Sequence, residues 1–363
     1  MRFWLTFPSM CYIFDIFAFR IIGYDDHMRA FVEEISRFLR EEGFGVELAG
    51  SVADAYCDIL TVTGQTFGQT AVKPRTVLAV GVEARTPEQA ALQQTALLEV
   101  IQDIVKECGE YPLILTQDRW SSGGRVIRAR LLAHLQRFAQ IYARNCEVRR
   151  IDKATAQAFL KENHSYADAA CRYRYGLFLK RHTGHNALAG NLKPPADETP
   201  EANIMERILP GTLVAVATFS NARKWVKGDR TIRSYEWTRY ASLPGIRLSG
   251  GMGKILRTFV KEVQPDDIMT YADLEWSKGD VYEQLGFAFE GIRPPVTFSI
   301  DTATWSRLSL PVNLTAKADM PPMDKESLGE VRTGASENCG VSDVVFYTNQ
   351  GSNKFRMKLT EYQ

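Results

Sequence analysis

The stretch YASLPGIRLSGGMGKILRTFVKEV, residues 240–263, decides how the rest of this chain is interpreted. A strand-like segment ends in a glycine-rich turn, and apolar residues then recur at the spacing of an amphipathic helix. Gly250, Gly251 and Gly253 carry no Cβ, so the backbone can approach a ligand closely, and Lys254 follows them. The first N–H groups of the helix point at the turn, where backbone donors and the helix dipole favour an anion such as phosphate. A tight strand-to-helix turn without a ligand is the alternative.

A second stretch, YADLEWSKGDVYEQLGFAFEG at residues 271–291, strengthens the first interpretation. A strand runs into polar residues and glycine, a short helix carries Tyr282, and another strand follows. Taken alone, this is a turn with a helix capped by Ser277 or Asp280. Taken with the glycine-rich turn upstream, it predicts one side of a cleft.

The two stretches together resemble the GNAT acyltransferase superfamily, through Gly251-Met252-Gly253, a helix, a strand and then Tyr282-x-x-x-Gly286-Phe287. The resemblance implies acetyl-CoA or a related acyl donor as cosubstrate. Its pyrophosphate would lie on the turn formed by Gly250, Gly251, Gly253 and Lys254. Tyr282 would be the general acid that protonates the leaving thiolate. The Gln or Arg that usually stands three positions before the first glycine is replaced here by Leu248.

A wider resemblance runs from residue 140 to residue 287. Its blocks, in chain order, are QIYARNCEVRRI, FLKENH, YGLFLK, LVAVATFS, YEWTRYAS, GGMGK and TYADLEWSKGDVYEQLGF. They resemble a family of phage and mobile-element proteins whose C-terminal domain is GNAT-like and related to the phage Mom DNA-modification protein. Many members carry a Vsr-like or PD-(D/E)xK nuclease domain in front. The family usually continues its Asn-His pair with Leu/Ile-Gln-Gly, whereas Ser165-Tyr166-Ala167 follows here.

This resemblance implies a cluster of site residues, which are Asn163, His164, Glu236, Arg239, Asp273, Ser277 and Tyr282. His164 is a candidate general base because the ordinary pKa of histidine lies near neutrality, although a structural histidine is the alternative. Asp273 and Ser277 would orient the substrate, which Asn163, Glu236 and Arg239 would bind. Two interpretations of Arg239 stay open, namely binding a phosphate or carboxylate and pairing with Glu236.

The N-terminal half predicts the element order α-β-β-β-α-β. The expected elements are a helix at 27–42, strands at 45–49, 58–63 and 76–84, a helix at 87–107 and a strand at 112–116, followed by a basic helix near 125–142. This order suits a restriction-endonuclease-like domain, in which Asp58 and Glu83 would bind Mg²⁺. Arg85 stands where that motif has lysine, and arginine is too basic to exchange a proton readily. A degenerate nuclease-like domain is therefore favoured over an active one, and an unrelated α/β domain is also open.

The predicted organisation has three parts. An apolar extension covers 1–25, a nuclease-like α/β domain 26–143, and a GNAT-like domain 144–363 with insertions near 182–208 and 315–340. The tail VSDVVFYTNQGSNKFRMKL, residues 341–359, suggests a returning hairpin.

Composition narrows the function classes only in part. The 363 residues carry a formal net charge of +1, but residues 119–181 hold 14 Lys/Arg against 4 Asp/Glu, which suggests a surface for DNA or simply a solvated basic one. Six scattered cysteines and the lack of a long apolar span favour the cytoplasm and no membrane. The leading hypothesis is an acyltransferase or a Mom-like nucleic-acid-modifying transferase. The alternatives are a Mg²⁺-dependent DNA nuclease and a non-catalytic DNA-binding mobile-element protein; the oligomeric state is left open.

Overall fold

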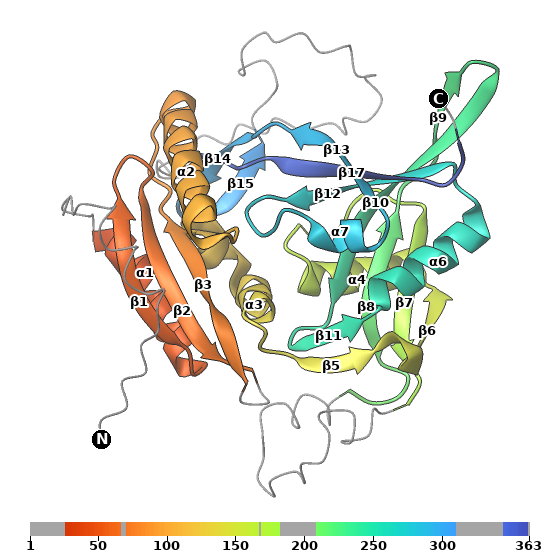
Figure 1. Ribbon diagram of the computed structural model, residues 1–363, viewed down its shortest axis with the longest axis horizontal. Coiled ribbons are helices and arrows are strands. Elements are labelled where there is room, and N and C mark those ends of the chain that lie inside the picture. The colour runs from red at the N-terminus through yellow and green to blue at the C-terminus, as the bar shows by residue number, and fades with distance from the viewer. Residues whose placement is uncertain (1–25, 67–69, 167, 182–207, 310–343, 362–363) are drawn as a thin grey trace, which may run out of the picture.

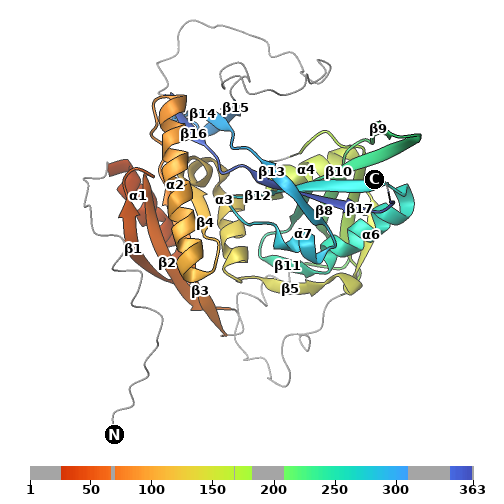
Figure 2. The same ribbon diagram turned by 45° about the horizontal axis from the view of Figure 1, so that its top comes forward.

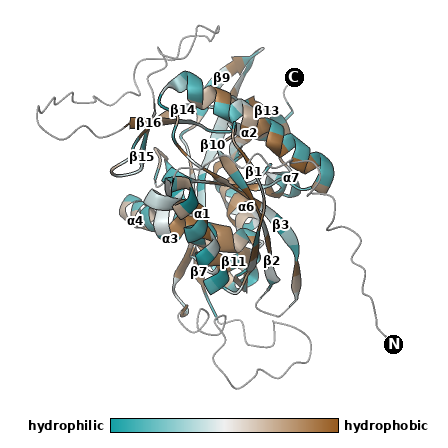
Figure 3. Ribbon diagram, turned by 90° about the vertical axis from the view of Figure 1, so that its left-hand side faces the viewer, coloured by the Kyte–Doolittle hydropathy of each residue, from teal (hydrophilic) through white to brown (hydrophobic). Residues whose placement is uncertain are grey.

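A computed structural model describes residues 26–66, 70–166, 168–181, 208–309 and 344–361, and these form a mixed α/β fold with several sheets (Figure 1). The predicted extension 1–25 and, apart from residue 208, the insertions near 182–208 and 315–340 lie outside the described residues. The helices carry hydrophobic and hydrophilic residues side by side (Figure 3). Within the described ranges, no helix is long and apolar enough to cross a membrane. The four described cysteines are free thiols.

The N-terminal half has the predicted α-β-β-β-α-β order. Its elements are α1 (Asp26–Glu41), β1 (Gly45–Val52), β2 (Cys57–Gln65), β3 (Ala71–Val80), α2 (Pro87–Cys108), β4 (Leu113–Thr116) and α3 (Gln117–His134). The strands form a sheet in the order β1-β2-β3-β4, in which β3 and β4 are parallel and the other pairs antiparallel. Thr86 caps α2 by accepting a hydrogen bond from the N–H of Gln89, and Pro87 stands at the first helical position.

Helices cover both faces of this sheet. Val77 and Ala79 of β3 are buried in one cluster with α1 and α3, whereas Leu78 and Val80 are buried in another with α2. Successive strand residues point to opposite faces, so the alternation places α1 and α3 on one side and α2 on the other.

The C-terminal half is built around one larger sheet. Its elements are β6 (Cys146–Arg150), α4 (Lys153–Asn163), β7 (Tyr173–Leu179), β8 (Leu213–Phe219), β9 (Arg223–Lys227), β10 (Arg230–Ser242), α6 (Gly251–Val263), β12 (Asp267–Asp273), α7 (Asp280–Gln284), β13 (Ala288–Arg293) and β17 (Ser352–Lys358). The strand order is β13-β17-β12-β10-β8-β7-β6, and β9 pairs with β10. Within this sheet β10 and β12 run parallel, and the other described pairs are antiparallel. Helix α6 packs on the sheet through Phe259, whose ring stacks on that of Phe219 with centroids 3.9 Å apart.

The basic helix expected near 125–142 is wrong at its C-terminal end. Helix α3 spans Gln117–His134 with a kink at Gly124, whose φ is 38°, so a helical segment does begin at Arg125. It ends at His134, and residues 139–142 form strand β5 (Ala139–Tyr142). A 3-10 turn, Ala143–Asn145, follows it. Strand β5 pairs in parallel with β11 (Ile246–Ser249). Ala139 and Ile141 are fully buried in the core of the C-terminal half, and the strand that pairs with β5 lies far along the chain.

Two further predictions about strands are also wrong. The third strand ends at Val80, so Glu83 lies beyond it and cannot share a strand face with Arg85. The tail is not a hairpin, because its two strands belong to different sheets. Strand β16 (Val344–Thr348) joins β14 (Thr297–Asp301) and β15 (Ser306–Ser309) in the order β15-β14-β16, whereas β17 pairs with β12 and β13.

The small sheet joins the two halves of the chain. Ile300, Val345 and Tyr347 are buried in the same cluster as α2 of the N-terminal half. An isolated bridge also links Ala84 to Phe346. Residues that the predicted boundaries assign to the GNAT-like domain therefore complete the core of the N-terminal half.

Candidate functional site

The parallel strands β10 and β12 separate toward their carboxyl ends. They pair over three residues, Ser234–Glu236 with Asp267–Met269. A bulge between Trp237 and Arg239 then redirects β10 along β8, while β12 stays paired with β17 as far as Asp273. The bulge is held by side chains, because the indole N–H of Trp237 donates to the carbonyl of Arg239 over 3.0 Å. A gap results in front of the glycine-rich turn.

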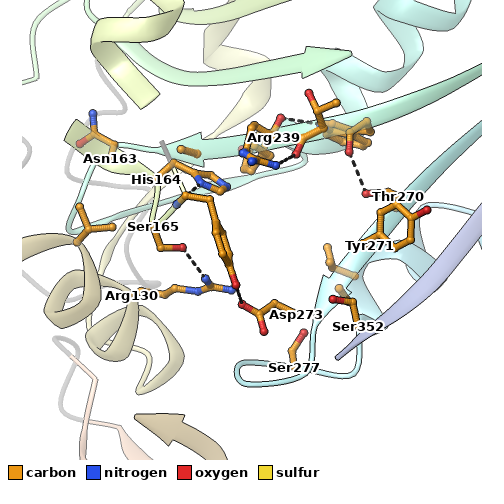
Figure 4. Close-up of a pocket in the computed structure, with 18 of the residues that line it drawn as sticks. Arg130, Asn163, His164, Ser165, Arg239, Thr270, Tyr271, Asp273, Ser277 and Ser352 are labelled. Atoms are coloured by element: carbon orange, nitrogen blue, oxygen red, sulfur yellow. Dashed lines mark hydrogen bonds between the residues drawn. The ribbon is translucent and has the colours of Figure 1, made fainter. Parts of the chain in front are cut away.

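A pocket of about 750 Å³ occupies this gap and extends to α3 of the N-terminal half. Its walls come from α3, the segment after α4, β10, β12 and the connections at 293–298 and 349–352. In Figure 4, Arg130 and residues 163–165 lie on the left of the pocket, and Thr270, Tyr271 and Ser352 lie on the right. Both halves of the chain are therefore needed to close it.

All seven residues that the resemblance grouped line this one pocket, namely Asn163, His164, Glu236, Arg239, Asp273, Ser277 and Tyr282. They come from three separate parts of the chain. Asn163 is the least available of them, since its side-chain amide donates to the carbonyl of Phe159 within its own helix.

His164 is held as a neutral hydrogen-bond donor. Its Nδ1 accepts the backbone N–H of Tyr166 over 3.0 Å, so the proton of the neutral ring lies on Nε2. Burial, and next the neighbouring charge of Arg239, lower the pKa of His164 to about 3. The ring has no free lone pair in this arrangement, and the geometry favours hydrogen-bond donation over the expected role as general base.

Tyr166 bridges two sides of the pocket. Its hydroxyl donates to Oδ2 of Asp273 over 2.7 Å, and the guanidinium carbons of Arg119 and Arg239 lie 4.3 Å and 5.8 Å from its ring centroid. Burial, and next the charge of Asp273, raise the pKa of Tyr166 well above its ordinary value. Its phenol therefore stays protonated, and two guanidinium groups lie near its ring, although Tyr166 as a whole is 41% exposed.

Arg130 brings a positive charge from α3 into the pocket. It donates to the hydroxyl of Ser165 over 3.2 Å, and its guanidinium stacks over the ring of Trp276. Burial lowers the pKa of Arg130, and the negative charge of Asp273 opposes that change. Burial likewise lowers the pKa of Arg239, and the negative charge of Glu236 opposes that change. The charge of Glu236 therefore acts on Arg239.

Tyr282 lies in an aromatic cage. Its ring contacts those of Trp237, Phe287 and Phe355 at centroid distances of 6.4, 5.9 and 5.5 Å. Burial raises the pKa of Tyr282, and a hydrogen bond with the side chain of Thr270 opposes the change in part. The phenol is therefore protonated at neutral pH, as a general acid must be.

Ser277 does not cap α7, which corrects the simpler interpretation of that stretch. The N-cap is Gly279, with φ of 99° and no side-chain cap, and Asp280 already lies inside the helix. The Ser277 hydroxyl instead accepts the N–H of Gly279 over 3.1 Å. A Cβ at Gly279 would stand 2.5 Å from the ring of Phe355, so this tight turn requires glycine.

A second pocket of about 560 Å³ adjoins the first turn of α6 and carries the exposed cations Arg144, Arg257 and Lys261. None of the three forms an ion pair with any described residue. Lys254 also lines this pocket, but its ammonium donates to the carbonyls of Ala143 and Cys146 over 2.9 and 2.5 Å. The ammonium of Lys254, which the sequence predicts to bind an anion, thus donates hydrogen bonds to the backbone. The other cations that line this pocket are Arg144, Arg257 and Lys261.

The three glycines of the turn differ in backbone conformation and in the space available for a Cβ atom. Gly250 has φ of 76°, in the left-handed region. A Cβ on Gly251 would lie 2.9 Å from Cβ of Leu248 and 3.0 Å from the hydroxyl of Tyr240, so packing alone excludes a larger residue. At Gly253 the nearest atoms are 3.3 Å away. Close packing therefore accounts for Gly251 without any ligand.

The basic residues between 119 and 181 do not all lie on one surface. Arg119 is buried against Glu275, Arg128 pairs with Glu34, and Arg150 pairs with Glu262. Arg130 reaches the first pocket and Arg144 the second. These positions separate charges that are neighbours in the sequence.

The two residues predicted to bind Mg²⁺ lie in the N-terminal half, away from this pocket. Asp58 of β2 is buried and accepts a hydrogen bond from Ser51, whereas Glu83 follows the end of β3. Within the described part of the chain, no group of three or more His, Cys, Asp or Glu side chains is placed to hold a metal ion. The Mg²⁺ site stays a prediction.

No protein-family model matches the sequence, and no curated protein matches it. The functional argument therefore depends on geometry. Two residues of the first pocket, Arg130 and Tyr166, are not among the predicted site residues. Arg130 is one of many arginines in its segment, and nothing local distinguishes it. Tyr166 lies where the chain departs from the family pattern after Asn-His, and that departure is the available signal.

Proposed function

We propose that this chain is a group-transfer enzyme of GNAT-like fold, which moves an acyl group from a donor of the coenzyme A type to an amine. The observation that carries the proposal is the separation of β10 and β12 directly in front of the first turn of α6. In open α/β sheets, ligands bind in the crevice outside the carboxyl ends of parallel strands. The free N–H groups of α6 favour a phosphate at the same place.

The two pockets suit the two ends of an extended, anionic donor. Met252 lines the first pocket, and Gly250 and Lys254 line the second, so the pockets lie on either side of the first turn of α6. Arg144 and Arg257 would hold phosphate groups in the second pocket. The acyl end would then enter the first pocket, where the titratable groups gather.

The side chains of the first pocket supply what acyl transfer needs. The donor brings a thioester, whose carbonyl carbon bonds to the amine nitrogen as its bond to sulfur breaks. Glu236 is our candidate to take the amine proton, because its carboxylate has no hydrogen bond or ion pair with a described residue. Tyr282 is the candidate to protonate the sulfur, and the Nε2–H of His164 can donate to the carbonyl oxygen.

Binding of the donor is the first test. Acetyl-CoA at a hundred times its dissociation constant should stabilise the folded chain by about 2.7 kcal/mol, measured as a rise in melting temperature. The double variant Arg144→Gln/Arg257→Gln should lose most of that rise, and the matched variant Lys224→Gln/Lys227→Gln, in a distant hairpin, should keep it. No rise at millimolar acetyl-CoA would contradict the proposal.

Chemistry is the second test. Release of free thiol from acetyl-CoA should require an amine, to be sought among polyamines, lysine peptides and oligonucleotides with adenine or cytosine. Glu236→Gln should lower the rate while donor binding stays unchanged. Gly251→Asp is a poor probe of the donor site, because its side chain would collide with Leu248 whether or not a donor binds.

A further inference from the structure

Strands β9 and β10 form a hairpin that projects from the body of the molecule, as both Figure 1 and Figure 2 show. Five residues of β9, Arg223–Lys227, pair with Arg230–Ser234 of β10. The turn has two residues, Gly228 and Asp229, and φ of 60° at Gly228 suits a tight hairpin turn. Every residue from 223 to 230 is exposed.

The hairpin is strongly basic. Residues 223–233 contain five Lys/Arg and one acidic residue, Asp229. Arg230, beside the turn, and Arg233 lie 3.6 and 3.7 Å from the carboxylate of Asp266. On β9, Arg223, Lys224 and Lys227 form no ion pair with any described residue. Three uncompensated cations therefore crowd a ribbon about 17 Å long.

The cations point to both faces of the ribbon. Because strand residues alternate, Arg223 and Lys227 lie on one face, and Lys224 lies on the other, with its cross-strand partner Arg233. A flat anionic surface, such as a membrane or the side of an acidic protein, would contact either Arg223 and Lys227 or Lys224, but not all three. A groove with phosphates on both walls would contact both faces.

We propose that this hairpin docks in the major groove of double-stranded DNA. The major groove of B-form DNA is about 12 Å wide and admits a two-stranded β-ribbon, whereas the deep, narrow major groove of double-stranded RNA does not. Lysine and arginine on both faces meet the two phosphate backbones. Trp225 and Val226, 36% and 73% exposed, add apolar surface for base edges and thymine methyl groups.

The hairpin is continuous with the pocket. Strand β10 runs from Arg230 in the hairpin to Glu236 at the pocket wall, six residues or about 20 Å further on. A bound duplex would lie beside the pocket, which fits a DNA base as acceptor. DNA docking itself does not depend on the transferase proposal, since it uses no residue of either pocket.

The test is fluorescence anisotropy of the full chain with a labelled 30-base-pair DNA duplex, at several salt concentrations. Affinity should fall steeply with salt, and Lys224→Gln/Lys227→Gln should weaken binding on the order of tenfold and lower the salt slope by about 2. Arg144→Gln/Arg257→Gln, which removes two exposed cations of the second pocket, should bind DNA like the parent. Asp229→Asn removes the acidic residue of the turn and should strengthen binding.

The two proposals fail separately. If acetyl-CoA does not raise the melting temperature but the chain still binds DNA, the transferase proposal is wrong and the hairpin proposal stands. The hairpin proposal is overturned if the parent does not bind the duplex in 50 mM salt, or if the hairpin variant binds like the parent. Equal or tighter binding to double-stranded RNA, or to vesicles containing anionic lipid, would overturn the assignment to DNA.

Discussion

A buried ionic cluster links the small C-terminal sheet to α3, and its removal gives the sharpest prediction about stability. Arg307 of β15 forms an ion pair with Asp118 of α3, lies 3.6 Å from Glu275, and donates to the Thr116 hydroxyl over 2.8 Å. The side chains of Asp118 and Glu275 are 0% and 1% exposed. Arg119 lies 3.3 Å from Glu275, so two cations neutralise two carboxylates.

We predict that Arg307→Met destabilises the chain by about 3 to 5 kcal/mol at pH 7.5, because two buried carboxylates are left with one cation. Methionine approximates the stem of arginine, so most of the loss is electrostatic. The matched control is Lys73→Met, whose ion pair with Glu110 spans 2.8 Å but whose side chain is 65% exposed. That change should cost at most about 1 kcal/mol.

The pH dependence separates the charge from the packing. Burial favours the neutral form of Asp118, but Arg307 outweighs it and lowers the pKa; burial raises the pKa of Glu275. Without Arg307 the pKa of both carboxyls should rise. As the pH falls, these groups take up protons and the unfavourable buried negative charge disappears. The difference between parent and variant should therefore shrink from pH 7.5 to pH 5.

Urea unfolding followed by tryptophan fluorescence measures both quantities. A loss of less than about 1 kcal/mol at pH 7.5 would contradict the prediction, since it would mean that the carboxylates find other partners or water. A loss that stays constant with pH would also refute it, because a packing defect has no such dependence.

Three further predictions concern the pocket and its surroundings. Burial, and next neighbouring arginines, lower the pKa of His134 and of His164 to about 3. As the pH falls below about 6.5, the unfolded chain therefore binds two protons that the folded chain does not, and stability falls by up to about 2.7 kcal/mol per pH unit. NMR signals assigned to His134 and His164 that titrate above pH 5 would contradict this. Gly251→Ala should destabilise by about 1 to 3 kcal/mol and Gly253→Ala by less than 1 kcal/mol, because only the first meets atoms within 3.0 Å; equal melting temperatures would argue against it. Tyr282→Phe should slow thiol release by about a hundredfold or more without changing the melting-temperature rise in acetyl-CoA, and an unchanged rate would remove the phenol as proton donor.

Local patterns were sufficient for much of the secondary structure. The 3.6-residue period from 27 to 42 and the proline before residue 88 mark α1 and α2 in the sequence, and each signal concerns residues a few positions apart. The hydrophobic pattern of the sequence does not identify strand β5, nor does it show that β16 and β17 belong to different sheets, because the partners of these strands lie far along the chain. A short apolar run has the same appearance in a helix and in a strand whose partner is distant.

The features of the pocket also fall into two groups, those that local sequence predicts and those that depend on the fold. Sequence patterns alone predict the glycine-rich turn, the helix behind it and the polar residues around Tyr282, since close approach of backbone and helical periodicity are local properties. Three features appear only in the folded chain: β10 and β12 separate there, Arg130 enters from α3, and Lys254 is held by backbone carbonyls. Those outcomes depend on sheet pairing and on packing between the two halves, where the free energy comes from contacts that no short stretch contains.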